Sequence, residues 1–221
     1  GYHIPEAARS ARGRAIVNIV QLAAGEKIAA ILPVLANGTG YLVMATRNGL
    51  IKKTATSEFD HILRSGKIAI RIVEGDELIG VQFATGNDEI VVASRSGKCI
   101  RFSETDVRPM GRDTMGVRAM TLSPGDAVVD MLVLREGSDI LTVSENGYGK
   151  RTDPADYRLQ SRGGKGIKAG VFNEKTGALV NMKLVTDEDD VMLVTSAGIV
   201  IRMHAEAISC IGRNTRGVRL M

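Results

Sequence analysis

Aromatic residues and cysteines are scarce in this sequence, and both shortages exclude classes of function. Phe and Tyr make up 4% of the 221 residues, Trp is absent, and the aromatics do not alternate with the basic segments, which argues against a stacking platform for single-stranded nucleic acid. Cys99 and Cys210 have no CxxC partner and no histidine nearby at metal-ligand spacing. We therefore expect no disulfide framework and two reduced, buried thiols.

Long hydrophobic runs are also missing. The longest nearly unbroken apolar run, residues 28–36, has nine residues and includes Pro33, whereas a transmembrane helix needs roughly 20. The first residues, Gly-Tyr-His-Ile-Pro-Glu, lack the charged and apolar regions of a signal peptide. We expect no transmembrane helix and a cytoplasmic protein.

No arrangement of residues typical of catalysis or metal binding is found along the chain. His3, His61 and His204 are dispersed, and none adjoins a cysteine or carboxylate at ligand or catalytic spacing. The acidic residues 187–190 could suggest a metal site, but they lack the glycine and spacing of a calcium loop, which favours an acidic turn before a strand at 191–195. We expect no catalytic residue, no metal and no cofactor in this domain.

A repeat of about 50 residues organises the sequence. A Gly-Asp/Glu-like element begins each full unit at Gly25, Gly75, Gly125 and Gly177. A hairpin glycine follows an apolar run and precedes a basic one at Gly49, Gly97, Gly147 and Gly198. A closing glycine precedes a short apolar and basic segment at Gly13, Gly66, Gly116, Gly166 and Gly217. Three frames in step predict one domain with repeats at about 1–24 (partial), 25–74, 75–124, 125–176 and 177–221.

Each repeat reads as four short strands. In one unit they are expected at residues 78–84, 89–94, 98–102 and 117–122, with a two-residue turn at Ser96-Gly97. The Asn-Gly pairs that end at Gly49 and Gly147 predict type I′ hairpin turns. Four strands per repeat indicate an all-β, propeller-like ring whose blades are these units, and an irregular β-sandwich is the alternative.

Charge is distributed unevenly within each repeat. Segments 9–14, 52–71, 95–118, 150–168 and 202–219 hold 24 of the 29 Lys and Arg residues but 8 of the 25 Asp and Glu residues. In a ring of equivalent units this pattern predicts a positive band around the perimeter, suited to a continuous polyanion such as duplex DNA held by its phosphates. The alternative is that these side chains are ordinary solvated surface.

The densest cluster of glycine and basic residues is a heptad in the repeat 125–176. Two readings are open: its glycine amides approach a phosphate while Arg162 and Lys165 supply charge, or the glycines serve a tight turn. It is not a Walker P-loop, because Leu159 replaces the first glycine and Gly166 replaces the Ser or Thr. The heptad consists of Gln160, Ser161, Arg162, Gly163, Gly164, Lys165 and Gly166.

Four segments carry a resemblance to a known family: YHIPEAARSARGRAIVN from Tyr2, GDELIGV from Gly75, NGYGKRT from Asn146 and IGRNTRGV from Ile211. They closely resemble the C-terminal, DNA-wrapping domain of the DNA gyrase A protein, of the type IIA topoisomerases, and the resemblance covers essentially the whole chain. The family box Gln-Arg-Arg-Gly-Gly-Lys-Gly matches the heptad except at Ser161.

The resemblance implies a β-pinwheel, with six blades in the complete family domain, that wraps duplex DNA on its outer rim. It implies partners: the rest of the gyrase A protein and the gyrase B protein, in an A2B2 bacterial enzyme associated with the nucleoid. That enzyme supercoils DNA negatively with ATP and Mg in other domains, so this fragment alone would not be an enzyme. The family box belongs to the first blade, whereas the heptad lies in a later repeat. The heptad is either the functional box or a repeat of its sequence that does not perform its function.

We predict that basic residues in the recurring loops contact phosphates: Arg12, Arg14, Lys52, Lys53, Arg64, Lys67, Arg101, Arg112, Arg118, Arg162, Lys165, Lys168, Arg213, Arg216 and Arg219. Three alternatives stay open. The equivalent domain of topoisomerase IV shares the ring, a propeller-type scaffold would bind proteins through its charged faces, and a propeller enzyme would need a polar constellation in a central pocket.

Overall fold

The computed structural model describes residues 6–8, 10–13, 15, 18, 20, 22, 25–32, 39–61 and 66–221. Its regular elements are strands and short 3-10 helices, and no helix in these ranges is long and apolar enough to cross a membrane. The 3-10 helices are η2 (Thr56–Phe59), η3 (Glu104–Asp106), η4 (Pro154–Asp156) and η5 (Ala205–Ala207). The strands are β1 (Tyr41–Thr46), β2 (Leu50–Ala55), β3 (Leu78–Ala84), β4 (Glu89–Ser94), β5 (Lys98–Ser103), β6 (Val117–Arg118), β7 (Val128–Val133), β8 (Asp139–Ser144), β9 (Tyr148–Thr152), β10 (Ile167–Lys168), β11 (Leu179–Val185), β12 (Asp190–Val194), β13 (Val200–His204) and β14 (Val218–Arg219).

The strands form at the positions predicted from the pattern, with one difference in length. In the repeat 75–124, β3 and β4 have the expected bounds and β5 is one residue longer, but the last strand is β6, which covers two residues instead of six. The acidic residues 187–190 form the predicted turn into β12. The buried, free Cys99 is as expected, whereas Cys210 is exposed, which corrects the prediction of two buried thiols.

The hairpins are closed by three residues rather than two. Between β1 and β2 the amide of Gly49 donates to the carbonyl of Thr46 at 3.0 Å, and Gly49 has a φ of 85°. Gly97 and Gly147 occupy the same place, with φ values of 79° and 74°. The predicted hairpins are therefore confirmed, but their turns are three-residue loops with glycine in the left-handed region, not the two-residue turns expected.

Successive repeats exchange strands, which the sequence pattern did not reveal. Within the described residues there are three four-stranded sheets, in the orders β3-β1-β2-β6, β10-β5-β4-β7 and β11-β8-β9-β14, and β12 pairs with β13 alone. The hairpin β1–β2 comes from the repeat 25–74, but both flanking strands, β3 and β6, come from the repeat 75–124. A blade is therefore the hairpin of one repeat completed by the outer strands of the next, and a repeat is not itself a blade.

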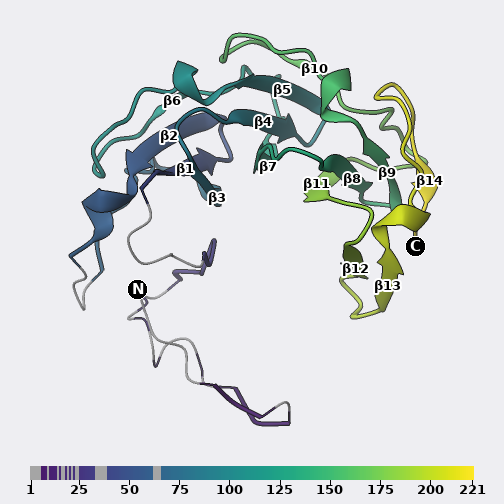
Figure 1. Cartoon of the computed structure of the whole chain (residues 1–221), viewed down its shortest axis with the longest axis horizontal. Helices are drawn as coiled ribbons and strands as arrows, with labels where there is room; N and C mark the ends of the chain where they lie inside the picture. The colour runs from purple at the N-terminus through teal and green to yellow at the C-terminus, as the bar shows by residue number, and fades with distance from the viewer. Residues whose placement is uncertain are drawn as a thin grey trace.

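The sheets follow one another along an arch (Figure 1), with β3, β7 and β11 on its concave side and β6, β10 and β14 on its convex side. Alternate side chains of each central strand enter the cores on its two sides: Ile90 and Val92 of β4 pack with the sheet of β1, and Val91 and Ala93 pack with the sheet of β8. Because both of their faces are buried, β1 and β4 are nearly continuous apolar runs, whereas β2 and β9 bury polar and charged side chains.

Candidate nucleic-acid interface

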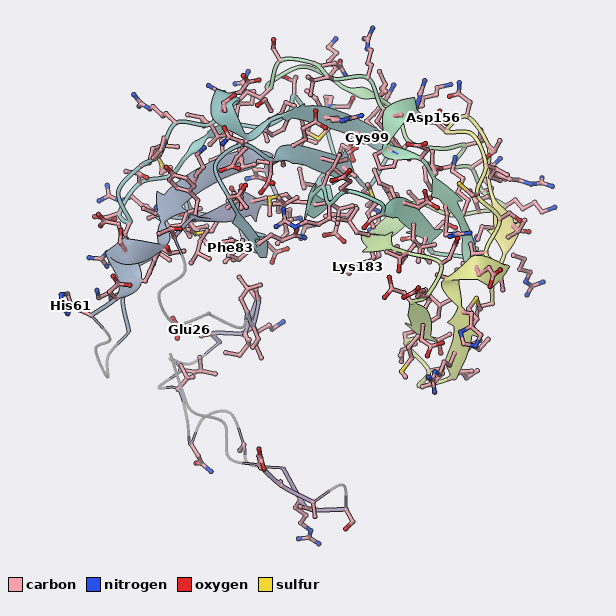
Figure 2. The ribbon with its side chains drawn as sticks, in the orientation of Figure 1. Glu26, His61, Phe83, Cys99, Asp156 and Lys183 are labelled. Carbon is pink, nitrogen blue, oxygen red and sulfur yellow. The ribbon has the colours of Figure 1, made fainter. Side chains whose placement is uncertain are left out.

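The outermost strand of each four-stranded sheet carries a cation at the same position. Arg118 on β6, Lys168 on β10 and Arg219 on β14 are all exposed on the convex side of the arch. Figure 2 shows many nitrogen-tipped side chains projecting outward from this edge. We call the surface formed by β6, β10, β14 and the loops that precede them the convex rim.

A glycine before each of these strands lets the rim lie against the hairpin beneath it. Gly116, Gly166 and Gly217 have φ values of 95°, 69° and 81°. A Cβ at each would clash with the backbone of the adjacent hairpin strand, for example with the carbonyl of Cys99 beside Gly166. Glycine is required here both for the left-handed backbone and for the close approach, so the closing-glycine frame marks where the rim docks.

The arginines of the rim loops connect neighbouring blades. Nη1 of Arg112 donates to the carbonyl of Ile68 at 3.2 Å, Nη1 of Arg162 to that of Arg118 at 2.9 Å, and Nη1 of Arg213 to that of Lys168 at 2.6 Å. These arginines are half-buried. They add positive charge to the rim. Their guanidinium groups also link each rim loop to the closing segment of the preceding repeat.

The heptad uses its glycines for the same docking. The amide of Gly163 donates to the carbonyl of Ala119 at 2.6 Å, and the carbonyls of Gly163 and Gly164 accept from the hydroxyl and the amide of Thr121 at 2.7 and 2.8 Å. Of the two readings left open by the sequence, these contacts favour the tight turn, because the Gly163 amide is already occupied. Lys165 of the same loop is exposed.

Besides Arg112, Arg162 and Arg213, four more of the predicted phosphate contacts lie inward or are engaged within the protein. Lys52 and Lys53 are 0% and 3% exposed, so the prediction that they contact phosphates is corrected. Lys53 pairs with buried Glu104 at 3.1 Å and lies 4.7 Å from the ring centre of Tyr41. The half-buried Arg101 pairs with Glu89 and donates to the carbonyls of Pro154 and Tyr157 at 2.7 and 3.0 Å, and Lys67 donates to that of Glu58 at 3.3 Å.

The ammonium of Lys52 bonds the carbonyls of Ala69 and Arg112, and its burial lowers the pKa of this lysine to about 8. It lies on β2, which is covered on the outer side by β6. Of the remaining predicted residues, Arg12 is exposed outside any strand, and Arg14 and Arg64 lie outside the described residues.

Several rim cations have side chains that make no hydrogen bond or ion pair within the described part of the chain. Among the predicted residues these are Arg118, Lys165, Lys168 and Arg216. Arg219 donates to the carbonyl of Met221 at 3.0 Å. Sequence reasoning missed two more rim cations of this kind, the exposed Arg108 and Arg158, and a third unpaired cation beside the rim, the half-buried Lys98 on β5. The 50-residue interval between Arg108 and Arg158 is the signal that could have found these two.

Lys98 and Lys168 face each other directly across β5 and β10. Like charges in directly opposite positions of antiparallel strands are destabilising. The rim therefore holds a repulsive pair at its centre, which a bound anion would relieve.

Away from the rim, several charged groups pair with one another. An open cleft of about 580 Å³ includes Glu89, Arg101, Asp88 and Arg135 in its lining. Here Arg101 pairs with Glu89, and Arg135 pairs with Asp88 at 3.0 Å. At the hairpin turns Arg95 pairs with Glu145 in the same way. At the rim, Arg112 lies 3.9 Å from Glu58, and Asp113 of the same loop pairs with Arg71. Within the described residues, no ion pair reaches Arg118, Lys165, Lys168 or Arg216, so these rim cations keep their charge unpaired.

A family model described as the DNA gyrase C-terminal domain, beta-propeller, matches residues 1–35, 40–84, 88–135, 138–186 and 189–221. The segments recur about every 50 residues and cover nearly all of the sequence, and the last four begin one residue before β1, β4, β8 and β12, so they start at the hairpins and not at the predicted repeat boundaries. The chain belongs to this family. The resemblance inferred from the sequence motifs is thereby confirmed, as is the β-pinwheel type of fold.

Over the matched region, relatives in the family are identical to this chain at almost half of the positions. The DNA gyrase A protein of Escherichia coli (strain K12) is 47% identical over 221 residues, and that of Staphylococcus epidermidis (strain ATCC 12228 / FDA PCI 1200) is 44% identical over 225. The match covers 100% of this chain and 25% of each relative. The chain therefore spans about a quarter of the length of these relatives.

Solved structures agree with the fold. A DNA gyrase A C-terminal domain superposes with a TM-score of 0.85 at 28% identity, over 94% of this chain and 70% of that one. The C-terminal domain of DNA topoisomerase IV has a TM-score of 0.87 at 22% identity, over 95% of this chain and 66% of that one. The likeness to topoisomerase IV shows the same fold, and the higher identity lies with the gyrase domain.

Proposed function

We propose that this domain binds duplex DNA along the convex rim and bends it around the arch. The rim cations contact phosphates on the DNA backbone, so binding is independent of base sequence and depends steeply on salt. The bend is held by contacts that recur from blade to blade. The basic residues of the rim loops set the path of the DNA.

One observation carries this proposal: Arg118, Lys168 and Arg219 occupy equivalent positions on the outermost strands of three successive sheets. A polyanion that follows the convex edge meets a cation at each blade in turn. The opposed Lys98 and Lys168 at the middle of this path add support, since phosphate would remove their repulsion. A surface shaped only for solubility gives no reason for such a pair.

Membership of this family suggests the larger assembly in which the domain would bind DNA. We propose that the domain acts within a bacterial gyrase, together with the rest of the gyrase A protein and with the gyrase B protein in an A2B2 assembly near the nucleoid in the cytoplasm. In that assembly the DNA held on the rim supports negative supercoiling driven by ATP. The domain itself contributes DNA binding, while strand passage, ATP and Mg belong to other domains.

The test is a titration of the domain with duplexes of about 40 and about 150 base pairs at several salt concentrations. If the seven exposed rim cations Arg108, Arg118, Arg158, Lys165, Lys168, Arg216 and Arg219 each neutralise one phosphate, the plot of log affinity against log salt has a slope of about −6. A relaxed circle, treated with a topoisomerase in the presence of the domain, then reports any trapped writhe.

Wrapping predicts preference for the long duplex together with a shift in linking number. Steep salt dependence without either result would mean that the rim binds DNA but does not bend it. Weak binding with a shallow slope would contradict the proposal and favour a scaffold that meets protein partners.

A further inference from the structure

One buried position beneath the rim differs between blades. Three residues after the hairpin glycine stand Lys52, Ile100 and Lys150 on β2, β5 and β9. In each case the side chain lies under the rim loop that the following repeat places over the hairpin. Lys52 and Lys150 are 0% and 1% exposed, and Ile100 is 0% exposed.

Where the position holds lysine, its ammonium organises the loop above it. Nζ of Lys150 donates to the carbonyl of Gly212 at 3.0 Å, to that of Arg213, and to the hydroxyl of Thr215 at 3.3 Å. The Thr215 hydroxyl in turn donates to the carbonyl of Gly212 at 2.8 Å. The buried charge thus holds three points of one short loop.

The loop above Lys52 has the same design. The ammonium bonds the carbonyl of Arg112, and the hydroxyl of Thr114 donates to the carbonyl of Gly111 at 3.0 Å. The two loops share the pattern Gly-Arg-Asp/Asn-Thr, at residues 111–114 and 212–215.

Where the position holds isoleucine, the loop is of another kind. Residues 161–164 read Ser-Arg-Gly-Gly, and a Cβ on Gly164 would lie 3.5 Å from Cδ1 of Ile100. An isoleucine side chain donates no hydrogen bond. The amide of Thr121 donates to the carbonyl of Gly164, as the amides of Arg71 and Val171 donate to the carbonyls of Thr114 and Thr215 in the lysine blades. Among these three loops, the preceding repeat also holds Gly163 in this one, through the carbonyl of Ala119 and the hydroxyl of Thr121.

We propose that this buried residue is a positioning residue that selects the form of the rim loop: lysine for Gly-Arg-Asp/Asn-Thr, isoleucine for Ser-Arg-Gly-Gly. Through the loop it sets where the rim cations stand, such as Arg213 and Arg216 above Lys150. The effect on DNA rests on the proposed function, whereas the effect on the loop does not.

The test is a cycle of variants in the blade of Lys150. The first variant is Lys150→Ile. The second converts the loop to the other form with Gly212→Ser, Asn214→Gly and Thr215→Gly. The third combines all four substitutions. Lys175→Ile is the control, because this substitution also removes one positive charge, but from an exposed lysine outside the rim.

Hydrogen exchange of the backbone amides at 211–217 is read without DNA. Lys150→Ile and the loop variant are each expected to exchange there about tenfold faster, because charge-assisted hydrogen bonds are lost. The combined variant is expected to return to within about twofold of the parent, a coupling that a merely destabilised core would not show. Additive effects, or unchanged exchange in Lys150→Ile, would overturn the proposal.

DNA binding is measured on the same proteins. Lys150→Ile is expected to reduce the salt slope by about one, and the combined variant to restore it. Restored exchange protection without restored DNA binding would contradict the role at the interface. Loss of binding in all proteins, including the control and parent, would instead refute the proposed function.

If Lys150→Ile does not fold, the reverse substitutions in the blade of Ile100 test the proposal. Ile100→Lys, combined with Ser161→Gly, Gly163→Asp and Gly164→Thr, is expected to protect the amides of 161–165 better than Ile100→Lys alone. Equal exchange in the two would overturn the proposal.

Discussion

Two neighbouring strands of one sheet carry basic residues that differ in burial. Lys52 and Lys53 on β2 are buried, whereas Arg118 on β6, which pairs with β2, is exposed. In the sequence both segments belong to the basic half of a repeat. The difference follows from the order of strands: β2 lies between β1 and β6 and is covered on both faces, whereas β6 is the outer edge. A local excess of lysine therefore does not by itself indicate a binding surface.

Removal of a buried cation is expected to have the largest effect on stability. Lys53→Met would leave the carboxylate of Glu104 buried without its partner, so the free energy of unfolding should fall by about 3–5 kcal/mol. Urea unfolding measures this loss. Lys53→Met combined with Glu104→Gln should recover part of it, and a loss below about 1 kcal/mol would show that the pair is not buried as described.

The docking of the outer strand is tested by Gly166→Ala. The new Cβ would meet the backbone of β5, and alanine would adopt a φ of 69°, so a loss of about 1–3 kcal/mol is expected. Gly111→Ala is the matched control, because no atom lies within 4 Å of its Cβ position. Equal stability of the two variants by urea unfolding would contradict the close approach of β10 to β5.

Removal of an exposed rim cation should have opposite effects on the stability of the fold and on DNA binding. Lys168→Met relieves repulsion with Lys98, so unfolding should become harder by about 0.2–1 kcal/mol. The same change should lower the salt slope of DNA binding by about one, for all DNA sequences alike. Urea unfolding and fluorescence anisotropy give the two values. A less stable protein with an unchanged slope would place Lys168 in a structural role.

The pH dependence of stability tests the burial of Lys52 and Lys150 against the exposed lysines of the chain. Burial lowers the pKa of Lys52 and of Lys150 to about 8, below the ordinary value for lysine, so the unfolded chain binds more protons above pH 8. The melting temperature should therefore rise from about pH 8 to about pH 10, where lysines of the unfolded chain begin to lose their protons as well. Burial raises the pKa of Cys99 to about 12 and also raises that of Tyr157, so the folded chain keeps these protons to higher pH than the unfolded chain. At still higher pH the trend should therefore reverse.

Thermal unfolding in buffers of matched ionic strength gives the profile. The variant with Lys52→Met and Lys150→Met should lose the rise, while Lys175→Met should keep it. A melting temperature that falls steadily from pH 8 in the parent would contradict the burial of these ammonium groups.

Much of the fold could be predicted because its signals are local. The glycine frames marked the hairpins and the closing strands, and apolar runs marked β3, β4 and β5. The exposed cations of the closing strands followed from their place after Gly116 and Gly166. The role of Arg112, Arg162 and Arg213 could not be predicted, because their partners are carbonyl groups of the preceding repeat, and any residue type supplies a carbonyl.

The sequence by itself determined the period of the repeat, the positions of its strands and the uneven distribution of charge, since glycine geometry and side-chain alternation act over a few residues. The tertiary structure alone decided which strands share a sheet, and hence which lysines are buried. Pairing between strands of different repeats joins residues about 30 to 70 positions apart, such as Ile51 with Val117 and Arg101 with Leu159. No local pattern records that choice, because the backbone groups that make the pairs are the same in every repeat.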